Sequence, residues 1–347
     1  MARSRKGRAG RAAALGAVVA GLVLGGCSGG GHKGAEGLPD PAAGTVAAFD
    51  LDGLGGGFPL QRDVSDLPYG SHVAAGRGGA GYVAHRTASD GSTEILRLTS
   101  QGEVSRFASL GPGPTVFGLT ALPDGSLAVG RGATLLRVTG KGAPAALPAD
   151  HRFTGPVPIG ARPDGSLVVL DAGQVWSVRD GHTSALTDAA GADGLGPGAV
   201  DGAGTAYVVP AGKNRLDAVR VVPPAGGTHA LRVTGHLPGG SAPVSGLEVY
   251  TLAGAADGFY ATAGTPDGTA TYLIRVHGTA ADVLAAFGAP AEAATCAAGH
   301  HYPALGNPCV MPYFALPLGD RVLLVGQSDG RAAGPALAVR AAPSPGA

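Results

Sequence analysis

Short apolar runs separated by glycine, proline and aspartate follow one another along most of this chain. Residues 161–178 show the pattern most clearly: the end of one strand, a tight turn at Pro163-Asp164-Gly165, a second strand, another tight turn and a third strand. In such a turn proline presets φ, aspartate bonds to the local backbone and glycine supplies a positive φ. Short β-branched and apolar runs bounded by glycine are typical of strands. The segment therefore predicts three consecutive β-strands.

The same sequence pattern occurs six times along the chain. The equivalent positions in the third strands are Arg97, Arg137, Ser177, Arg220, Arg275 and Ala338. The first three intervals, of 40, 40 and 43 residues, are close to the period of a four-stranded propeller blade. The later intervals, of 55 and 63 residues, predict insertions. A pair of β-sandwiches also contains many short strands, but the near-equal periods favour a propeller.

Each repeat then needs a fourth, outer strand. The candidates are residues 104–110, 143–147, 183–186, 230–234 and 281–287. No such strand follows Val339, whereas residues 45–50 form a spare strand near the N-terminus. Closing a ring removes exposed sheet edges. We therefore predict an all-β fold, a six-bladed β-propeller of four-stranded blades closed by an N-terminal strand, with seven blades as the alternative if residues 46–61 form more than one strand.

The N-terminus has the pattern of an export signal. Residues 1–11 are basic, residues 12–24 form an apolar run of 13, and small residues precede Cys27. This run is too short for an ordinary transmembrane helix and suits a signal peptide. The small residues before the cysteine resemble the bacterial lipobox, which implies cleavage before Cys27 and its acylation, with palmitate among the acyl groups. A plain secretory signal with an incidental cysteine is the alternative.

These features predict the organisation of the chain. Residues 1–26 are a lipoprotein signal peptide, residues 27–43 the lipidated cysteine and a flexible tether, residues 44–340 the propeller, and residues 341–347 a disordered tail. The expected location is the extracytoplasmic face of the cell membrane, with the protein held by a lipid anchor.

Composition narrows the range of partners. The chain has 62 Gly and 27 Pro, yet 44% of its residues are hydrophobic, so most of it can bury a core. Its formal net charge is zero, which predicts no nucleic-acid surface. Besides membrane lipid at Cys27, we expect an envelope protein, a glycan or a small molecule as partner, and a monomeric state.

Two further cysteines predict a disulfide. Cys296 and Cys309 lie in a protein expected to be exported, where thiols are usually oxidised. The bond would close a loop of 14 residues and would stabilise the fold by roughly 3 kcal/mol in the chain-entropy model.

The loop between these cysteines is the candidate ligand loop. It has no strand pattern, lies between the fifth and sixth repeats, and contains His300, His301 and Tyr302. Its spacing of cysteine and histidine matches no common zinc signature, so no metal site is assigned. Specificity is expected here, where the repeat breaks down.

The repeat phrase itself is similar to that of known families. Pro-Asp-Gly-Ser-Leu-x-Val occurs at residues 123–129 and 163–169, and the pattern over about residues 44–340 resembles NHL-repeat-like and gluconolactonase-like bacterial propellers. The phrase is shared by propellers of unrelated function, so it indicates the fold and not the activity.

That resemblance leaves two functions open. Gluconolactonase-like propellers are lactone hydrolases whose central metal is held by Glu, Asn and Asp. This chain has only Asn214 and Asn307, and its few glutamates are irregularly spaced. We therefore assign no catalytic residue and no cofactor, and favour a non-catalytic scaffold. A metal-dependent, lactone hydrolase-like enzyme with its site in the central channel is the alternative, and ionisable groups converging on the axis would favour it.

Two further expectations concern the third strands. The recurrent arginines are expected at the solvent edge, where their stems cover apolar surface; these are Arg97, Arg137, Arg220 and Arg275. Trp176 is expected to pack between blades. The histidines scattered through the repeats, His151 among them, receive no role.

Overall fold

The computed structural model describes residues 38–42, 47–49, 73–86, 92–187, 195–267, 270–287, 301–302, 307–308, 311–327 and 336–341. All of them belong to one compact unit, residues 32–347. Within these residues, no helix has the length and apolarity needed to cross a bilayer. The described part of the chain includes three short 3-10 helices: η2 (Arg77–Gly79), η3 (Leu216–Ala218) and η4 (Val244–Gly246).

Six four-stranded antiparallel sheets make up the blades. Blade 1 contains β2 (Val73–Ala75), β3 (Gly81–Arg86), β4 (Ser92–Leu98) and β5 (Val104–Pro112). Blade 2 contains β6 (Val116–Ala121), β7 (Leu127–Arg131), β8 (Thr134–Val138) and β9 (Ala145–Ala146). Blade 3 contains β10 (Val157–Ala161), β11 (Leu167–Asp171), β12 (Gln174–Arg179) and β13 (His182–Ala185).

The second half of the chain repeats this order. Blade 4 contains β14 (Leu195–Val200), β15 (Ala206–Pro210), β16 (Arg220–Val222) and β17 (His229–Ala230). Blade 5 contains β18 (Glu248–Ala255), β19 (Gly258–Gly264), β20 (Thr271–His277) and β21 (Ala280–Phe287). Blade 6 contains β24 (Met311–Leu318), β25 (Arg321–Gln327), β26 (Ala336–Arg340) and β1 (Ala47–Phe49). A separate small hairpin pairs β22 (His301–Tyr302) with β23 (Asn307–Pro308).

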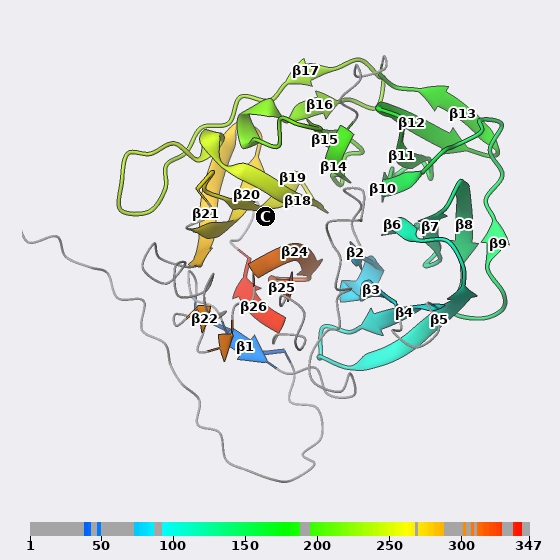
Figure 1. Ribbon diagram of the computed structural model, residues 1–347, viewed down its shortest axis with the longest axis horizontal. Coiled ribbons are helices and arrows are strands. Elements are labelled where there is room, and N and C mark those ends of the chain that lie inside the picture. The colour runs from blue at the N-terminus through cyan, green and yellow to red at the C-terminus, as the bar shows by residue number, and fades with distance from the viewer. Residues whose placement is uncertain are drawn as a thin grey trace, which may run out of the picture. The chain divides into compact units, whose positions relative to one another are not determined.

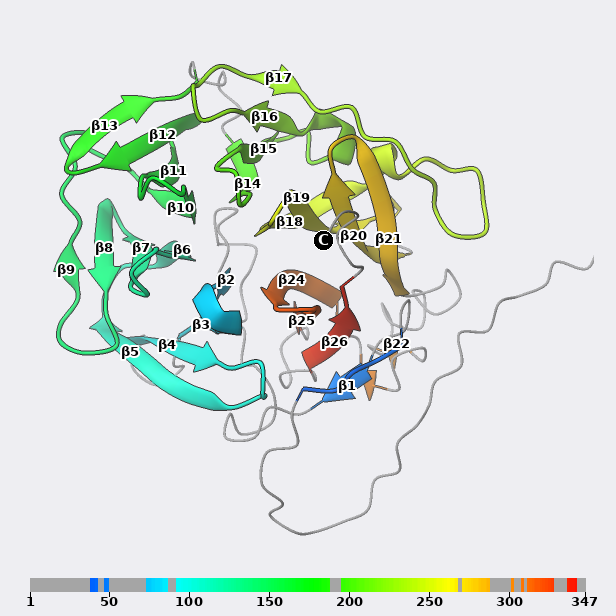
Figure 2. The same cartoon turned by 180° about the vertical axis from the view of Figure 1, so that it is seen from behind.

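The blades are arranged in a ring, which confirms the predicted six-bladed propeller (Figure 1). Their innermost strands contact one another in a closed cycle, β2 to β6, β10, β14, β18, β24 and back to β2. Figure 2 shows the same ring from behind, with the outermost strands on the rim. All five predicted outer strands are present, although β9 and β17 have only two residues each.

The predicted closure by the N-terminal strand is confirmed. β1 pairs with β26 through Ala47 opposite Ala338, and it forms the outermost strand of blade 6. The residues before β1 also contact this blade, since Arg321 Nη1 donates to the Leu38 carbonyl at 3.0 Å. Arg340 binds Asp40 with two hydrogen bonds, of 3.1 and 2.7 Å. The two ends of the propeller are thus joined in one sheet.

The hydrophobic core is divided among the six interfaces between blades. Each of the six apolar clusters joins two neighbouring blades; the largest joins blades 4 and 5, and the smallest of those described joins blades 2 and 3. The smallest cluster has six buried residues, which are Ala128, Leu135, Phe153, Leu167, Val169 and Val178. Among the described residues, the interface between blades 2 and 3 therefore has the smallest buried apolar cluster.

Glycines allow neighbouring blades to approach at backbone distance. A Cβ added at Gly130 would collide with the carbonyl oxygen of Pro156 in the next blade, and one added at Gly254 with that of Val200. Gly160 lies against the side chain of Val200 in the same way. These glycines are needed for the space they leave, because their φ angles are not in the left-handed region.

Replacing Gly254 by alanine should lower the free energy of unfolding by about 1–3 kcal/mol, since the new methyl group would overpack the interface between blades 4 and 5. Gly240→Ala is the matched control, because the nearest atom to a Cβ there is the Ala242 nitrogen at 3.8 Å. Equilibrium urea unfolding of both variants makes the comparison. Equal and small effects would contradict the role assigned to Gly254.

Candidate functional site: a cleft between blades 2 and 3

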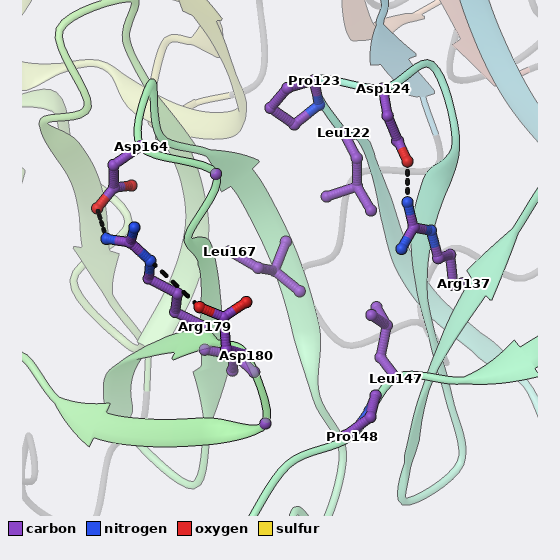
Figure 3. Close-up of a pocket in the computed structure, with 13 residues that line it drawn as sticks. Leu122, Pro123, Asp124, Arg137, Leu147, Pro148, Asp164, Leu167, Arg179 and Asp180 are labelled. Carbon is purple, nitrogen blue, oxygen red and sulfur yellow. Dashed lines mark hydrogen bonds and ion pairs between the residues drawn. The ribbon is translucent and has the colours of Figure 1, made fainter.

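A cleft of about 410 Å³ lies between blades 2 and 3 (Figure 3). The turn between β6 and β7 and the turn between β10 and β11 flank it, and the β12–β13 turn and the end of β9 contribute its outer part. Its lining residues are Leu122, Pro123, Asp124, Arg137, Leu147, Pro148, Asp164, Gly165, Leu167, Val178, Arg179, Asp180 and Gly181.

The two flanking turns have the same local structure. Asp124 Oδ1 accepts hydrogen bonds from the Ser126 backbone at 3.0 Å and hydroxyl at 2.6 Å. Asp164 Oδ1 accepts the equivalent bonds from Ser166 at 3.0 and 2.7 Å. The glycine that follows each aspartate has a φ of +84°, a conformation open to glycine without steric cost. The predicted turn mechanism is therefore confirmed in both blades.

Each turn aspartate is also paired with an arginine from the third strand of its own blade. Arg137 forms an ion pair with Asp124 Oδ2, and Arg179 Nη1 lies 3.2 Å from Asp164 Oδ2 (Figure 3). The repeat places Ser177, not an arginine, opposite the second turn. Side chains two residues apart on a strand share a face, so Arg179 replaces the arginine that the repeat lacks at position 177.

These ion pairs position the cleft walls more than they stabilise the fold. All four side chains are about half exposed, and exposed ion pairs contribute about 0.2–1 kcal/mol. Between the walls, Leu122, Leu147 and Leu167 point into the gap (Figure 3). With the Asp180 carboxylate, three acidic and two basic side chains line the cleft, which leaves one negative charge in excess.

A backbone contact at Gly181, one of the lining residues, joins the neighbouring blades. The Asp150 nitrogen, just after β9, donates to the Gly181 carbonyl at 2.9 Å. The Asp150 carboxylate accepts from the Thr183 nitrogen at 2.7 Å. These Thr183 hydrogen bonds, from its hydroxyl and its backbone, lower the pKa of Asp150 below its ordinary value. The outer edge of blade 2 is thereby attached to the β12–β13 hairpin of blade 3.

The next interface, between blades 3 and 4, is filled by a buried arginine. The side chain of Arg162, 6% exposed, donates from Nε to the Gly204 carbonyl at 3.0 Å and from Nη1 to that of Pro224 at 3.3 Å. A longer contact of 3.5 Å joins Nη2 to the Pro223 carbonyl. Burial lowers the pKa of Arg162 below its ordinary value.

Most of the site residues predicted from sequence lie outside the described part of the chain. Cys27, Cys296, Cys309 and His300 are in this group, so neither the lipid anchor nor the disulfide is tested. The backbones of His301 and Tyr302 form β22, paired with β23.

The third-strand arginines need one correction. Arg97, Arg137 and Arg220 are exposed as expected, but Arg275 is only 5% exposed. Its guanidinium pairs with Asp257 and lies 4.9 Å from the centre of the Tyr260 ring. The expectation of a solvent-edge position was wrong for Arg275 because its guanidinium folds back onto its own blade, where Nη1 also donates to the Val276 carbonyl at 2.8 Å.

Trp176 packs between blades, as predicted. It belongs to the apolar cluster of blades 2 and 3, and its ring stacks on His151 with 3.9 Å between ring centres. His151 Nε2 lies 3.8 Å from the buried Asp171 carboxylate. Asp171 also accepts hydrogen bonds from Thr154 and Gly155. This group holds the chain that enters blade 3, a structural role that the sequence pattern did not indicate for His151.

The innermost strands, as far as they are described, contain few charged residues. Among the six innermost strands as described, Glu248 is the one charged residue. Asn214 lies between β15 and η3, and Asn307 lies in β23. In the described part of the chain, no group of three or more His, Cys, Asp or Glu residues is placed to hold a metal ion.

Comparison with known proteins finds likeness only at the level of structure. No family model matches the sequence, and no curated protein matches it. A virginiamycin B lyase from Staphylococcus aureus is 15% identical, with 81% of each chain covered and a TM-score of 0.45. A gluconolactonase from Xanthomonas campestris is 12% identical, with 86% of this chain and 98% of that chain covered and a TM-score of 0.46.

A calcium-binding protein, regucalcin, from Agrobacterium tumefaciens is 13% identical, with 80% of this chain and 92% of that chain covered and a TM-score of 0.48. These likenesses carry no statement about activity. The propeller fold is established by the sheets of this chain itself.

Removing the Ser166 hydroxyl should raise the pKa of Asp164 toward its ordinary value. Backbone and side-chain hydrogen bonds from Ser166 hold that pKa low, and Ser166→Ala deletes the second of them. A carboxylate with a depressed pKa stabilises the fold above its unfolded pKa of about 3.9 and loses this effect as the pH falls through the folded value. The stability difference between Ser166→Ala and the parent should therefore shrink in acid.

An NMR titration of the Asp164 carboxyl measures the shift directly. Ser184→Ala, on the exposed face of β13, is the control and should leave the Asp164 titration unchanged. An unchanged Asp164 titration in Ser166→Ala would contradict the role given to the hydroxyl.

Proposed function

We propose that this protein is an extracytoplasmic lipoprotein whose propeller is a non-catalytic scaffold, and that it binds its ligand in the cleft between blades 2 and 3. The observation that carries the binding role is the cleft itself. It combines an apolar floor with charged walls, and its volume of about 410 Å³ lies within the range of small-molecule and side-chain binding pockets.

The positions of the cleft walls support this role. Asp124 and Asp164 are each held by a serine and an arginine of the same blade. The contact between Asp150 and Gly181 joins the two blades. A site with walls already in position loses less freedom on binding, and this raises affinity.

The membrane anchor is proposed from the sequence of the N-terminus. A basic segment, an apolar run of 13 residues and small residues before Cys27 occur there in order. One acyl chain gives marginal membrane binding and more than one gives stable anchoring, so we propose a multiply acylated Cys27. The glycine-rich tether would then separate the propeller from the bilayer.

Cys27→Ala should release the protein from the membrane. In a bacterial expression host, the parent is expected to incorporate labelled palmitate and to partition into the detergent phase of Triton X-114. The variant should do neither, because no thiol remains for acylation. Ser28→Ala is the control and should behave as the parent does. Equal partitioning of Cys27→Ala and the parent would refute the lipid anchor.

The exported protein should also contain a Cys296–Cys309 disulfide. When the protein is denatured without reductant, neither cysteine should react with a thiol reagent, and both should react after reduction. Mass spectrometry of the alkylated peptides measures this. Two reactive thiols before reduction would show that the bond is absent.

A further inference from the structure

The cleft between blades 2 and 3 and the buried Arg162 occupy equivalent places at successive blade interfaces. Leu122-Pro123-Asp124-Gly125-Ser126 leads from β6 to β7, and Arg162-Pro163-Asp164-Gly165-Ser166 leads from β10 to β11. Both segments close with the same hydrogen bonds, from residue 122 to 126 in one blade and from 162 to 166 in the other. Leu122 therefore stands where Arg162 stands one blade later.

The groups that receive Arg162 also have counterparts in the cleft. Leu167 pairs with Val178 in blade 3 as Ala206 pairs with Val222 in blade 4. Gly165 lies two residues before Leu167, and Gly204 lies two residues before Ala206. The Gly165 carbonyl therefore corresponds to the Gly204 carbonyl, which accepts from Arg162 Nε. The two glycines have φ angles of +88° and +84°. The Gly165 carbonyl is thus oriented as the one that accepts from a guanidinium at the next interface.

The outer acceptors correspond as well. Pro223 and Pro224, which follow Val222, accept from Arg162, and Arg179 and Asp180 follow Val178 and line the cleft. The turn after Val178 is the tighter one, a two-residue connection between Arg179 and His182. It adds to the cleft the Asp180 carboxylate, which is largely exposed and lies 3.6 Å from Arg179 Nε, so this interface offers a charged acceptor where the next one offers backbone alone.

We infer that the cleft binds an alkylguanidinium group, in the place that the Arg162 side chain takes between blades 3 and 4. The guanidinium lies against Gly165 and Asp180, and its aliphatic stem lies on Leu122 and Leu147. A planar fork of donors matches carbonyl and carboxylate acceptors held in fixed positions, and an alkyl stem is stabilised on apolar surface. The excess negative charge of the lining has the sign that a cation requires.

This inference rests on the binding role proposed above and names its ligand class. The same chemistry is carried by a free alkylguanidine and by an arginine side chain in a peptide. Separate probes distinguish these two sources, and the test of the Cys27 anchor is independent of both.

Titration of the full-length chain with ethylguanidinium, followed by amide NMR, tests the inference. Saturable binding of one molecule is expected, with the largest shifts at Gly165 and Gly181. Propylammonium, which has a similar stem and a compact charge, should bind at least tenfold more weakly. Gly-Arg-Gly amide is the peptide probe: tighter binding than ethylguanidinium assigns the site to peptides, and weaker binding assigns it to free alkylguanidines.

Exchanging the residues at the two equivalent positions gives the sharper test. Leu122→Arg should fill the cleft with its own guanidinium and weaken ethylguanidinium binding at least tenfold. Ala230→Arg, which adds the same group on an exposed strand of blade 4, should retain it. Arg162→Leu should create a second site, so that two molecules bind. If Arg162→Leu does not fold, Leu122→Arg and its Ala230→Arg control decide alone.

Three outcomes would overturn the inference. These are no saturable binding of either guanidinium probe by the parent, equal binding of ethylguanidinium and propylammonium, and unchanged binding in Leu122→Arg. Each would leave the anchor at Cys27 standing, and a cleft that bound another ligand class would still fit the scaffold role.

Discussion

The propeller depends on how closely neighbouring blades can approach. A larger residue would place its Cβ on a backbone carbonyl of the neighbouring blade at Gly130 and Gly254, and on the Val200 side chain at Gly160. Close packing on this scale tolerates few added atoms. This accounts for part of the glycine content, and it explains how a chain with 5% aromatic residues fills six interfaces. Further out between blades 2 and 3, where the turns after β6 and β10 face each other, a cleft remains.

Much of the fold could be predicted from the sequence because its determinants are local and repeated. The turn at Pro163-Asp164-Gly165 is encoded by three adjacent residues, and the outer position of β1 follows from counting strands. The burial of Arg275 could not be predicted, because it depends on contacts with Asp257 and Tyr260, which are distant from it along the chain. The local sequence pattern predicts which residues form a strand, but it does not predict which other residues bury their side chains.

The candidate site shows the same limit. The prediction of specificity in the loop 296–309 concerns residues that lie mostly outside the described part of the chain. The cleft that is described lies where the repeat is most regular, between two copies of Pro-Asp-Gly-Ser. The sequence contained one difference between the two turns that bears on the cleft, leucine at position 122 and arginine at position 162. This difference can be interpreted only when the partners of Arg162 are known, because Gly204 and Pro224 are distant from Arg162 along the chain. In the proposed site, a single exchanged side chain within a regular repeat would determine what the interface binds.

The pairing of β1 with β26 has a consequence for the order of events during synthesis. Ala47 is made early and its partner Ala338 is among the last residues of the propeller. Contacts so distant in sequence form slowly, and until they form both strands present open edges that can pair with other chains. A ribosome that stopped before residue 336 would release a chain whose first five blades are complete but whose ring cannot close. Completion of the ring therefore requires that synthesis has passed residue 338.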